Sequence, residues 1–472
     1  MRGGKAVKKY IVGIFLAAAL TAPIRGAGAA QTVEAEGAAQ TAEAVEAGDA
    51  AQTTEAVEAG DAAQTIEAME AEGATQTAEA VEAGDAVQTA ETVQQNDTSS
   101  SPLELRDFIK EHHPSPFTKM TEEEFDAQID ELERSWNNCG ETEHYYAMRR
   151  LVAALGDEHT MLLPPANITQ PELPFFVMIY DGHWMIVQAQ KEYGELVGKE
   201  LTAVNGTAVS RIREKLLPLI SSETQQWADM QCSQEIRYLQ NLKYTGIADS
   251  LAFVEITAKD IASGEEVTME VEASDGEYDY QNSSFYPMAQ TLAQSGYYYA
   301  TLLDDGSAFL QYNVCQENPR MTMREFAQKL EQQLLADAPE KVIIDLRHNS
   351  GGNSEVIRPL LETLEKFREK GSSLYCLTGP QTFSSGVMNA LDLQEIGAQL
   401  VGEPTGGVLA FGELVQKTLP DGSTLYCSTK DFSSAYGVSG QLQPEIEIVQ
   451  TAEDFLAGKD TAVDYICDGI VP

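Results

Sequence analysis

The sequence has few basic residues for its length. Its 472 residues include 31 Lys and Arg against 74 Asp and Glu, which gives a formal net charge of −43. Such a charge argues against nucleic acid and anionic membrane surfaces as partners. The segment 31–97 contains sixteen acidic residues and no basic ones, so most of the negative charge lies on the rest of the chain.

Cysteine is also sparse, and no C-x-x-C pair is present. This spacing disfavours metal knuckles, so we expect no metal and no cofactor. An even number of cysteines permits disulfides, but their pairing cannot be deduced from the sequence. Cys376 lies in a predicted buried strand and is interpreted as a small core residue. The six cysteines are Cys139, Cys232, Cys315, Cys376, Cys427 and Cys467.

Long hydrophobic runs are nearly absent. The run 11–22 is too short for a comfortable membrane span, and it follows a basic stretch and precedes the small residues of 27–29. This pattern predicts a secretory signal over 1–30, with an uncleaved anchor as the alternative. We therefore expect an exported protein, extracellular or associated with the cell envelope, with no stable membrane span after signal cleavage.

A repeat of twelve residues follows the predicted signal. Units such as AQTAEAVEAGDA recur within 31–101. Each unit has too few apolar residues to offset the entropy of ordering the chain, so we interpret 31–101 as a disordered acidic linker. A specific binding role for the repeat is the alternative.

The remaining sequence predicts an α/β (α+β) multidomain fold. Helical periodicity covers 102–165 and ends in the sequence GDEHT. Short strands are predicted over 170–275. Strands and helices alternate over 285–472, which favours an open sheet flanked by helices. A single last helix is expected over 452–467.

The stretch 341–407 carries the clearest chemical pattern. A buried strand at 342–344 leads into Gly351 and Gly352, whose turn can leave backbone N–H groups free to hold an oxyanion. A second strand, 373–378, leads to a corner at Ser384 before another predicted helix. An exposed hydroxyl on a rigid corner is the placement that a serine nucleophile needs.

Three motifs in this stretch read DLRHNSGG, TFSSG and LVGEPTGG. Together they resemble the carboxyl-terminal processing (tail-specific) serine peptidases, in the branch of tricorn protease and interphotoreceptor retinoid-binding protein. The resemblance runs from about Leu103 to the C-terminus. It implies a small N-terminal helical domain in 102–165, a PDZ-like β-rich module in 170–275 and a ClpP/crotonase-like catalytic domain in 285–472. A β-rich insert without a ligand is the alternative for the module.

The resemblance also implies roles for single residues. His159 lies in a D-x-H-T motif whose histidine is the general base in this branch. Ser384 is the predicted nucleophile, with Ser385 as the second candidate. The N–H of Ser385 and that of Gly351 or Gly352 would form the oxyanion hole. No lysine follows Glu403 closely, which disfavours a Ser–Lys dyad.

One element of the family pattern is missing. The segment 436–444 has no acid where the tricorn-like branch places its orienting glutamate. Asp157, Glu158 and Asp431 remain as substitutes. His348 is either a solvated loop residue or a second base, and Asp345 with Arg347 is most simply a structural ion pair.

These observations predict a secreted serine-type endopeptidase that cleaves peptides or proteins by acyl transfer. The alternative is a catalytically weak or inactive protein of the same fold that binds a peptide or an apolar ligand. The sequence leaves the oligomeric state open.

Overall fold

The computed structural model describes residues 100–472, apart from 277, 295, 437–439 and 470–472. The predicted signal at 1–30 and nearly all of the predicted linker at 31–101 therefore lie outside the described residues. None of the described helices combines the length and the apolar character that a membrane crossing requires.

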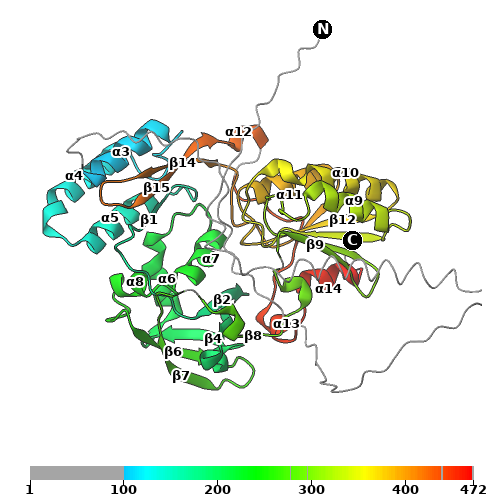
Figure 1. The fold of residues 1–472 in the computed structure, drawn as a ribbon, viewed down its shortest axis with the longest axis horizontal. Helices are drawn as coiled ribbons and strands as arrows, with labels where there is room; N and C mark the ends of the chain where they lie inside the picture. Colours follow the sequence, from blue (N-terminus) through cyan, green and yellow to red (C-terminus); the bar gives the residue numbers. More distant parts are fainter. Residues whose placement is uncertain (1–99, 277, 295, 437–439, 470–472) are drawn as a thin grey trace, which may run out of the picture.

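Three helices open the described chain and form one group (Figure 1). Their apolar faces bury Leu105, Ile109, Phe125 and Ile129. The second helix begins with a capping box, in which Thr121 and Glu124 satisfy each other's backbone N–H groups. The helices are α3 (Ser101–His112), α4 (Glu122–Ser135) and α5 (Glu141–Ala153), with a 3₁₀ turn at Trp136–Asn138.

A hairpin from the back half of the chain joins this group. Strands β14 (Phe411–Thr418) and β15 (Thr424–Asp431) pair with each other, and β15 pairs antiparallel with β1 (Met161–Leu163). The hairpin therefore belongs to the sheet of the helical group, although its sequence lies inside the predicted catalytic segment 285–472. Pairing between segments so distant in sequence leaves no local signal.

The β-rich module is built on a sheet with strand order β2-β3-β4-β6-β7. Its strands are β2 (Phe175–Tyr180), β3 (His183–Gln190), β4 (Glu200–Val204), β5 (Thr207–Ala208), β6 (Phe253–Lys259), β7 (Glu266–Glu272) and β8 (Ser283–Phe285). Its helices are α6 (Val209–Leu216), α7 (Gln225–Glu235) and α8 (Leu239–Tyr244), with 3₁₀ turns at Lys191–Leu196, Leu217–Leu219, Tyr280–Asn282 and Gln290–Leu292. Helices α7 and α8 were not expected in this strand-rich region.

The third part is an open sheet with strand order β16-β13-β12-β11-β10-β9, in which only the β9–β10 pair is antiparallel. Side chains alternate between its faces: Val342 and Ile344 pack with α9–α11, whereas Ile343 packs with α14. Helices therefore cover both faces (Figure 1). The strands are β9 (Tyr298–Leu302), β10 (Ala308–Tyr312), β11 (Lys341–Asp345), β12 (Ser373–Thr378), β13 (Gln399–Gly402) and β16 (Ile446–Glu447). The helices are α9 (Met323–Leu334), α10 (Arg358–Glu369), α11 (Ser385–Glu395) and α14 (Thr461–Cys467), with a 3₁₀ turn at Ser354–Ile357. The same stretch of sequence contains the short helices α12 (Ser433–Tyr436) and α13 (Ala452–Leu456), and α13 packs against β2 and β3 of the β-rich module.

The mixed α/β prediction is thus confirmed, and a further local difference lies at the C-terminal end. The predicted last helix over 452–467 is two helices, α13 and α14. Gly458 has a φ of +69°, a conformation that ends a helix, and Asp460 caps the next one by accepting the N–H of Val463. The chain therefore turns between the two helices.

Candidate active site

Ser384 lies on a corner that the surrounding chain holds in an unusual conformation. Its φ is +52° and its ψ is −124°, a region that residues with a side chain rarely occupy. Two hydrogen bonds of Thr382 hold the corner in place. The Thr382 hydroxyl donates to the carbonyl of Leu346 (2.8 Å) and accepts the N–H of Gly379 (3.0 Å). Ser384 is the N-cap of α11, so its hydroxyl stands at the start of a helix.

The double-glycine turn packs directly against this corner. Gly351 has a φ of +105°, and a Cβ there would lie 2.8 Å from the Ser384 Cβ and 3.0 Å from the Ser385 nitrogen. Gly352 has a φ of +133°, and a Cβ there would lie 2.4 Å from the carbonyl oxygen of Cys315. Glycine is therefore required at Gly351 for the close approach to Ser384, and at Gly352 for the close approach to Cys315.

The two serines of the corner differ in what their hydroxyls do. The Ser385 hydroxyl is buried and donates to the carbonyl of Gly352 at 2.7 Å. Ser384 is half-buried, and its hydroxyl makes no hydrogen bond with the described residues. The Ser385 hydroxyl thus helps to hold the corner, whereas that of Ser384 is available.

The three predicted oxyanion donors differ in the same way. The N–H of Gly351 donates to the side-chain oxygen of Asn349 at 3.0 Å. Within the described part of the chain, the N–H groups of Gly352 and Ser385 have no acceptor. Two backbone N–H donors, those of Gly352 and Ser385, are therefore available beside Ser384. The N–H of Gly351 is not available, and Gly351 contributes by packing closely against Ser384.

His159 lies in the loop between α5 and β1, against the residue that precedes Ser384. Its ring stacks on that of Phe383, with centroids 4.5 Å apart and planes at 27°. The side chain is buried, and neither ring nitrogen has a hydrogen-bond partner among the described residues. Burial lowers the pKa of His159, although the negative charge of Asp157 opposes the shift. The imidazole is therefore neutral at pH 7 and can accept a proton.

Asp157 holds the loop of His159 in place. One carboxylate oxygen accepts the N–H of His159 at 2.9 Å, and the other accepts bonds from His113 (3.0 Å), Ser428 (2.6 Å) and the Thr160 hydroxyl. Burial alone would raise the pKa of Asp157, but these bonds and the His159 charge outweigh it and lower the pKa. Asp157 thus supports the backbone of the loop and has no bond to the imidazole.

The other two substitutes for the orienting carboxylate are also engaged elsewhere. Glu158 accepts the N–H of Val408 at 2.9 Å, and Asp431 is exposed and accepts the N–H of Ser433 at 2.9 Å. None of the described carboxylates bonds to the His159 ring, since both of its nitrogens are unpartnered.

A further acid, the half-buried Glu223, lies beside the same loop, and no sequence motif contains it. Burial, and then the charge of Asp157, raises the pKa of Glu223 to about 8. Burial, followed by the charge of Glu223, raises the pKa of Glu158 well above its ordinary value. Each carboxyl group has one oxygen without a partner in the described structure. Glu223 therefore holds its proton at pH 7.

The remaining sequence candidates are structural. Arg347 pairs with Asp345 and Asp460, each at 2.8 Å, as the predicted ion pair required. His348 is buried, with its ring nitrogens bonded to Gln381 (3.3 Å) and to the carbonyl of Leu292 (3.2 Å). The interpretation of His348 as a solvated loop residue is therefore wrong. Both of its ring nitrogens are already engaged in hydrogen bonds, so neither is available to Ser384.

The cysteines form no site. All six are free thiols, and Cys376 is fully buried in β12 as predicted. The described residues contain no cluster of His, Cys, Asp or Glu that could hold a metal ion.

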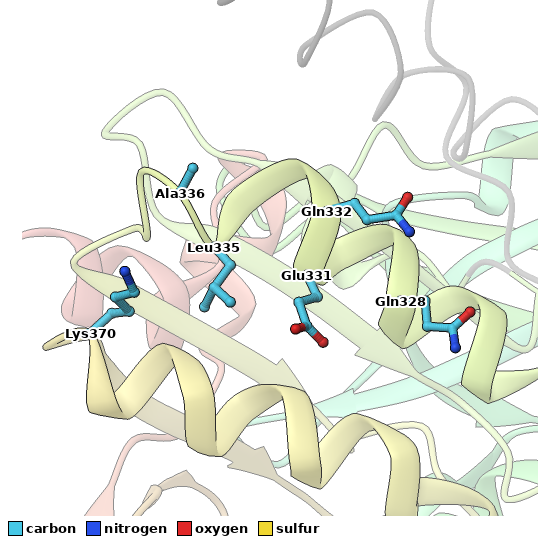
Figure 2. A pocket seen from close by; sticks show the side chains of 6 residues that line it. All are labelled: Gln328, Glu331, Gln332, Leu335, Ala336 and Lys370. Carbon is cyan, nitrogen blue, oxygen red and sulfur yellow. The ribbon is translucent and has the colours of Figure 1, made fainter.

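A surface groove of about 640 Å³ lies between α9 and α10 (Figure 2). It is lined by none of the residues discussed above. Glu331 on α9 and Lys370 after α10 face each other across it. None of the predicted site residues lines this groove.

Comparison with known proteins yields a match at the level of structure. No protein-family model matches the sequence, and no curated protein matches it significantly. The structure of mature CPAF is 14% identical with a TM-score of 0.56, over 78% of this chain and 96% of that one. The complex of mature CPAF with lactacystin is 15% identical with a TM-score of 0.55, over 78% and 97%. The photosystem II D1 C-terminal processing protease aligns at 13% identity over 78% and 95%, with a TM-score of only 0.38.

The match to CPAF covers nearly all of that chain and all three parts described here, from the helical group to the open sheet. Similarity at this level of identity establishes the fold. The chain therefore has the fold of mature CPAF.

Proposed function

We propose that the protein is an exported serine endopeptidase in which Ser384 is the nucleophile and His159 the general base. The observation that carries this proposal is the backbone of Ser384. A non-glycine residue held at φ +52° on a loop-to-helix corner is strained, and such strain is typical of sites where function requires it. The substrate would be a peptide or protein, as the motifs imply.

The chemistry follows from the groups around the corner. The neutral imidazole of His159 would take the proton of the Ser384 hydroxyl as the oxygen attacks a peptide carbonyl. The N–H groups of Gly352 and Ser385 would stabilise the negative oxygen of the tetrahedral intermediate. The protonated imidazole would then give its proton to the leaving amine, and water would release the acyl group by the reverse sequence.

Two features of the resting site require movement before catalysis. The imidazole has no bond to the Ser384 hydroxyl, and no described carboxylate fixes its orientation. Catalytic hydrogen bonds are often long in enzymes without substrate and shorten when substrate binds. A peptide in the site would therefore bring the imidazole and the hydroxyl into hydrogen-bonding distance.

The test is labelling of the purified full-length protein with a fluorophosphonate probe. We expect the parent protein and Ser385→Ala to be labelled, and Ser384→Ala and His159→Ala to be unlabelled. Hydrolysis of a mixed peptide library should show the same pattern. Absence of both labelling and hydrolysis from pH 5 to pH 9 would contradict the proposal and favour a ligand-binding protein of the same fold.

A further inference from the structure

We infer that Trp227 of α7 is a positioning residue that aligns Ser384 and His159 through the ring of Phe383. This inference rests on the proposed function and adds a residue that none of the motifs contains. Phe383 directly precedes Ser384, so the position of its ring determines how the corner is held.

The three rings form a stack. The Trp227 ring lies 3.9 Å from the Phe383 ring at an interplanar angle of 11°, and the His159 ring lies 4.5 Å from Phe383 at 27°. Trp227 is 1% exposed, and Phe383 and His159 are 4% exposed each. Trp227, Met230 and Phe383 form a hydrophobic cluster separate from the larger cores. Trp227 and Met230 are therefore the apolar neighbours that share this cluster with the Phe383 ring, and Trp227 stacks on it.

The start of α7 is anchored to the catalytic side of the molecule. The Thr224 hydroxyl accepts the N–H of Trp227 (3.0 Å), which caps the helix, and donates to the carbonyl of Gly406 (2.6 Å). A Cβ on Gly406 would lie 3.2 Å from the Trp227 ring, and one on Gly407 would lie 3.1 Å from the Ser384 nitrogen. The helix start and the corner are thus in contact through two tightly packed glycines.

The same segment also touches the loop of the base. The Ser221 hydroxyl donates to the carbonyl of Thr160 at 2.7 Å, one residue beyond His159. Residues 221–227 therefore contact both halves of the proposed site, although they lie in the β-rich module.

The stack matters more here because no hydrogen bond of the described residues restrains the imidazole ring itself. Its two ring nitrogens are unpartnered in the described structure, so no carboxylate fixes the ring plane. Stacking on Phe383, which Trp227 supports from α7, is what holds the ring. Displacement of a reacting group by about 1 Å can lower the rate on the order of a hundredfold.

The experiment compares Trp227→Leu and Trp227→Phe in the full-length protein. Leucine fills apolar space without a flat face, and phenylalanine keeps the face. We expect Trp227→Leu to lower kcat on a peptide substrate by about a hundredfold with KM changed less than about threefold, and Trp227→Phe to recover most of kcat. Trp136→Ala is the matched control, because Trp136 stacks on His144 at 3.9 Å outside the proposed site, and it should keep the parent kcat.

A second measurement does not depend on turnover. Loss of the Trp227 ring should admit water to His159, so the pKa of its imidazole, measured by NMR titration, should rise in Trp227→Leu and stay near the parent value in Trp227→Phe. A folded Trp227→Leu protein with parent kcat, or with an unchanged His159 titration, would overturn the inference. A parent protein without hydrolysis or probe labelling would instead refute the proposed function, and the titration would still decide the role of Trp227.

Discussion

Single residues at the corner show how far the sequence could predict the site. The double glycine, the strand before it and the corner of Ser384 were predictable because tight turns and buried strands leave local patterns. The different roles of the Ser384 and Ser385 hydroxyls could not be predicted. They depend on a hydrogen bond from the Ser385 hydroxyl to the carbonyl of Gly352, which lies 33 residues away in the sequence. Trp227 and Glu223 also had no local signal, because their partners lie far away in the sequence.

At this scale we predict that Gly351→Ala strongly reduces activity. The added Cβ would lie 2.8 Å from the Ser384 Cβ and would displace the corner. We expect fluorophosphonate labelling to slow by about a hundredfold or more. Gly371→Ala is the matched control, because Gly371 has the same φ of +105° but nothing within 4 Å of its Cβ position. Equal losses of labelling in both variants would attribute the effect to backbone strain alone.

Secondary-structure elements were predictable where capping and periodicity agree. The strand 373–378 and the helix after Ser384 were expected from the sequence and are present as β12 and α11. The break between α13 and α14 could have been predicted from Gly458, a residue type that ends helices, and from Asp460, a residue type that caps them. The connection from Asp460 to Arg347 was not readable, because it joins residues 113 positions apart.

At the scale of elements we predict that Arg347→Met releases α14 from the sheet. The guanidinium joins Asp345, at the end of β11, to Asp460, the cap of α14. Both acids are almost fully buried, so removing the cation leaves two uncompensated charges and should cost about 3–5 kcal/mol of unfolding free energy. Urea unfolding would measure the loss, and hydrogen exchange should show faster exchange in 461–467.

Arg358→Met provides the control for that substitution. Arg358, the first residue of α10, pairs with Glu355 in the preceding 3₁₀ turn, but its side chain is 67% exposed. Exposed ion pairs contribute about 0–1 kcal/mol. A loss at Arg347 no larger than that at Arg358 would show that the buried pair does not hold α14.

For the whole molecule, the arrangement of the parts was the least predictable feature. The hairpin β14–β15 pairs with β1, so a segment near residue 425 completes a sheet that begins near residue 161. Neither β1 nor β15 has a sequence pattern that identifies the strand with which it pairs. The pairing nevertheless determines the site, because Ser428 on β15 bonds to Asp157 in the loop of His159.

At this scale we predict that the protein loses stability as the pH rises from about 5 to 8. An unfolded Glu223 loses its proton near its ordinary pKa of 4.5, whereas burial keeps the folded residue protonated up to about pH 8. The folded state therefore binds more protons in this window, and its free energy of unfolding falls as protons leave. Glu223→Gln should remove roughly 2 kcal/mol or more of this loss at pH 8, measured by urea unfolding at a series of pH values.

The exposed Glu265 supplies the control, since Glu265→Gln removes the same formal charge from the surface of the module. If both substitutions change the pH dependence equally, the effect comes from net charge and not from burial of Glu223.

The position of β15 has a consequence for biosynthesis. A ribosome makes residues 157–163 more than 260 codons before it makes Ser428, which anchors Asp157. Until then the nascent polypeptide carries an unfinished loop around the imidazole, and its proposed nucleophile has no ordered base. Under the proposed function, hydrolytic capacity would therefore arise only near the end of translation.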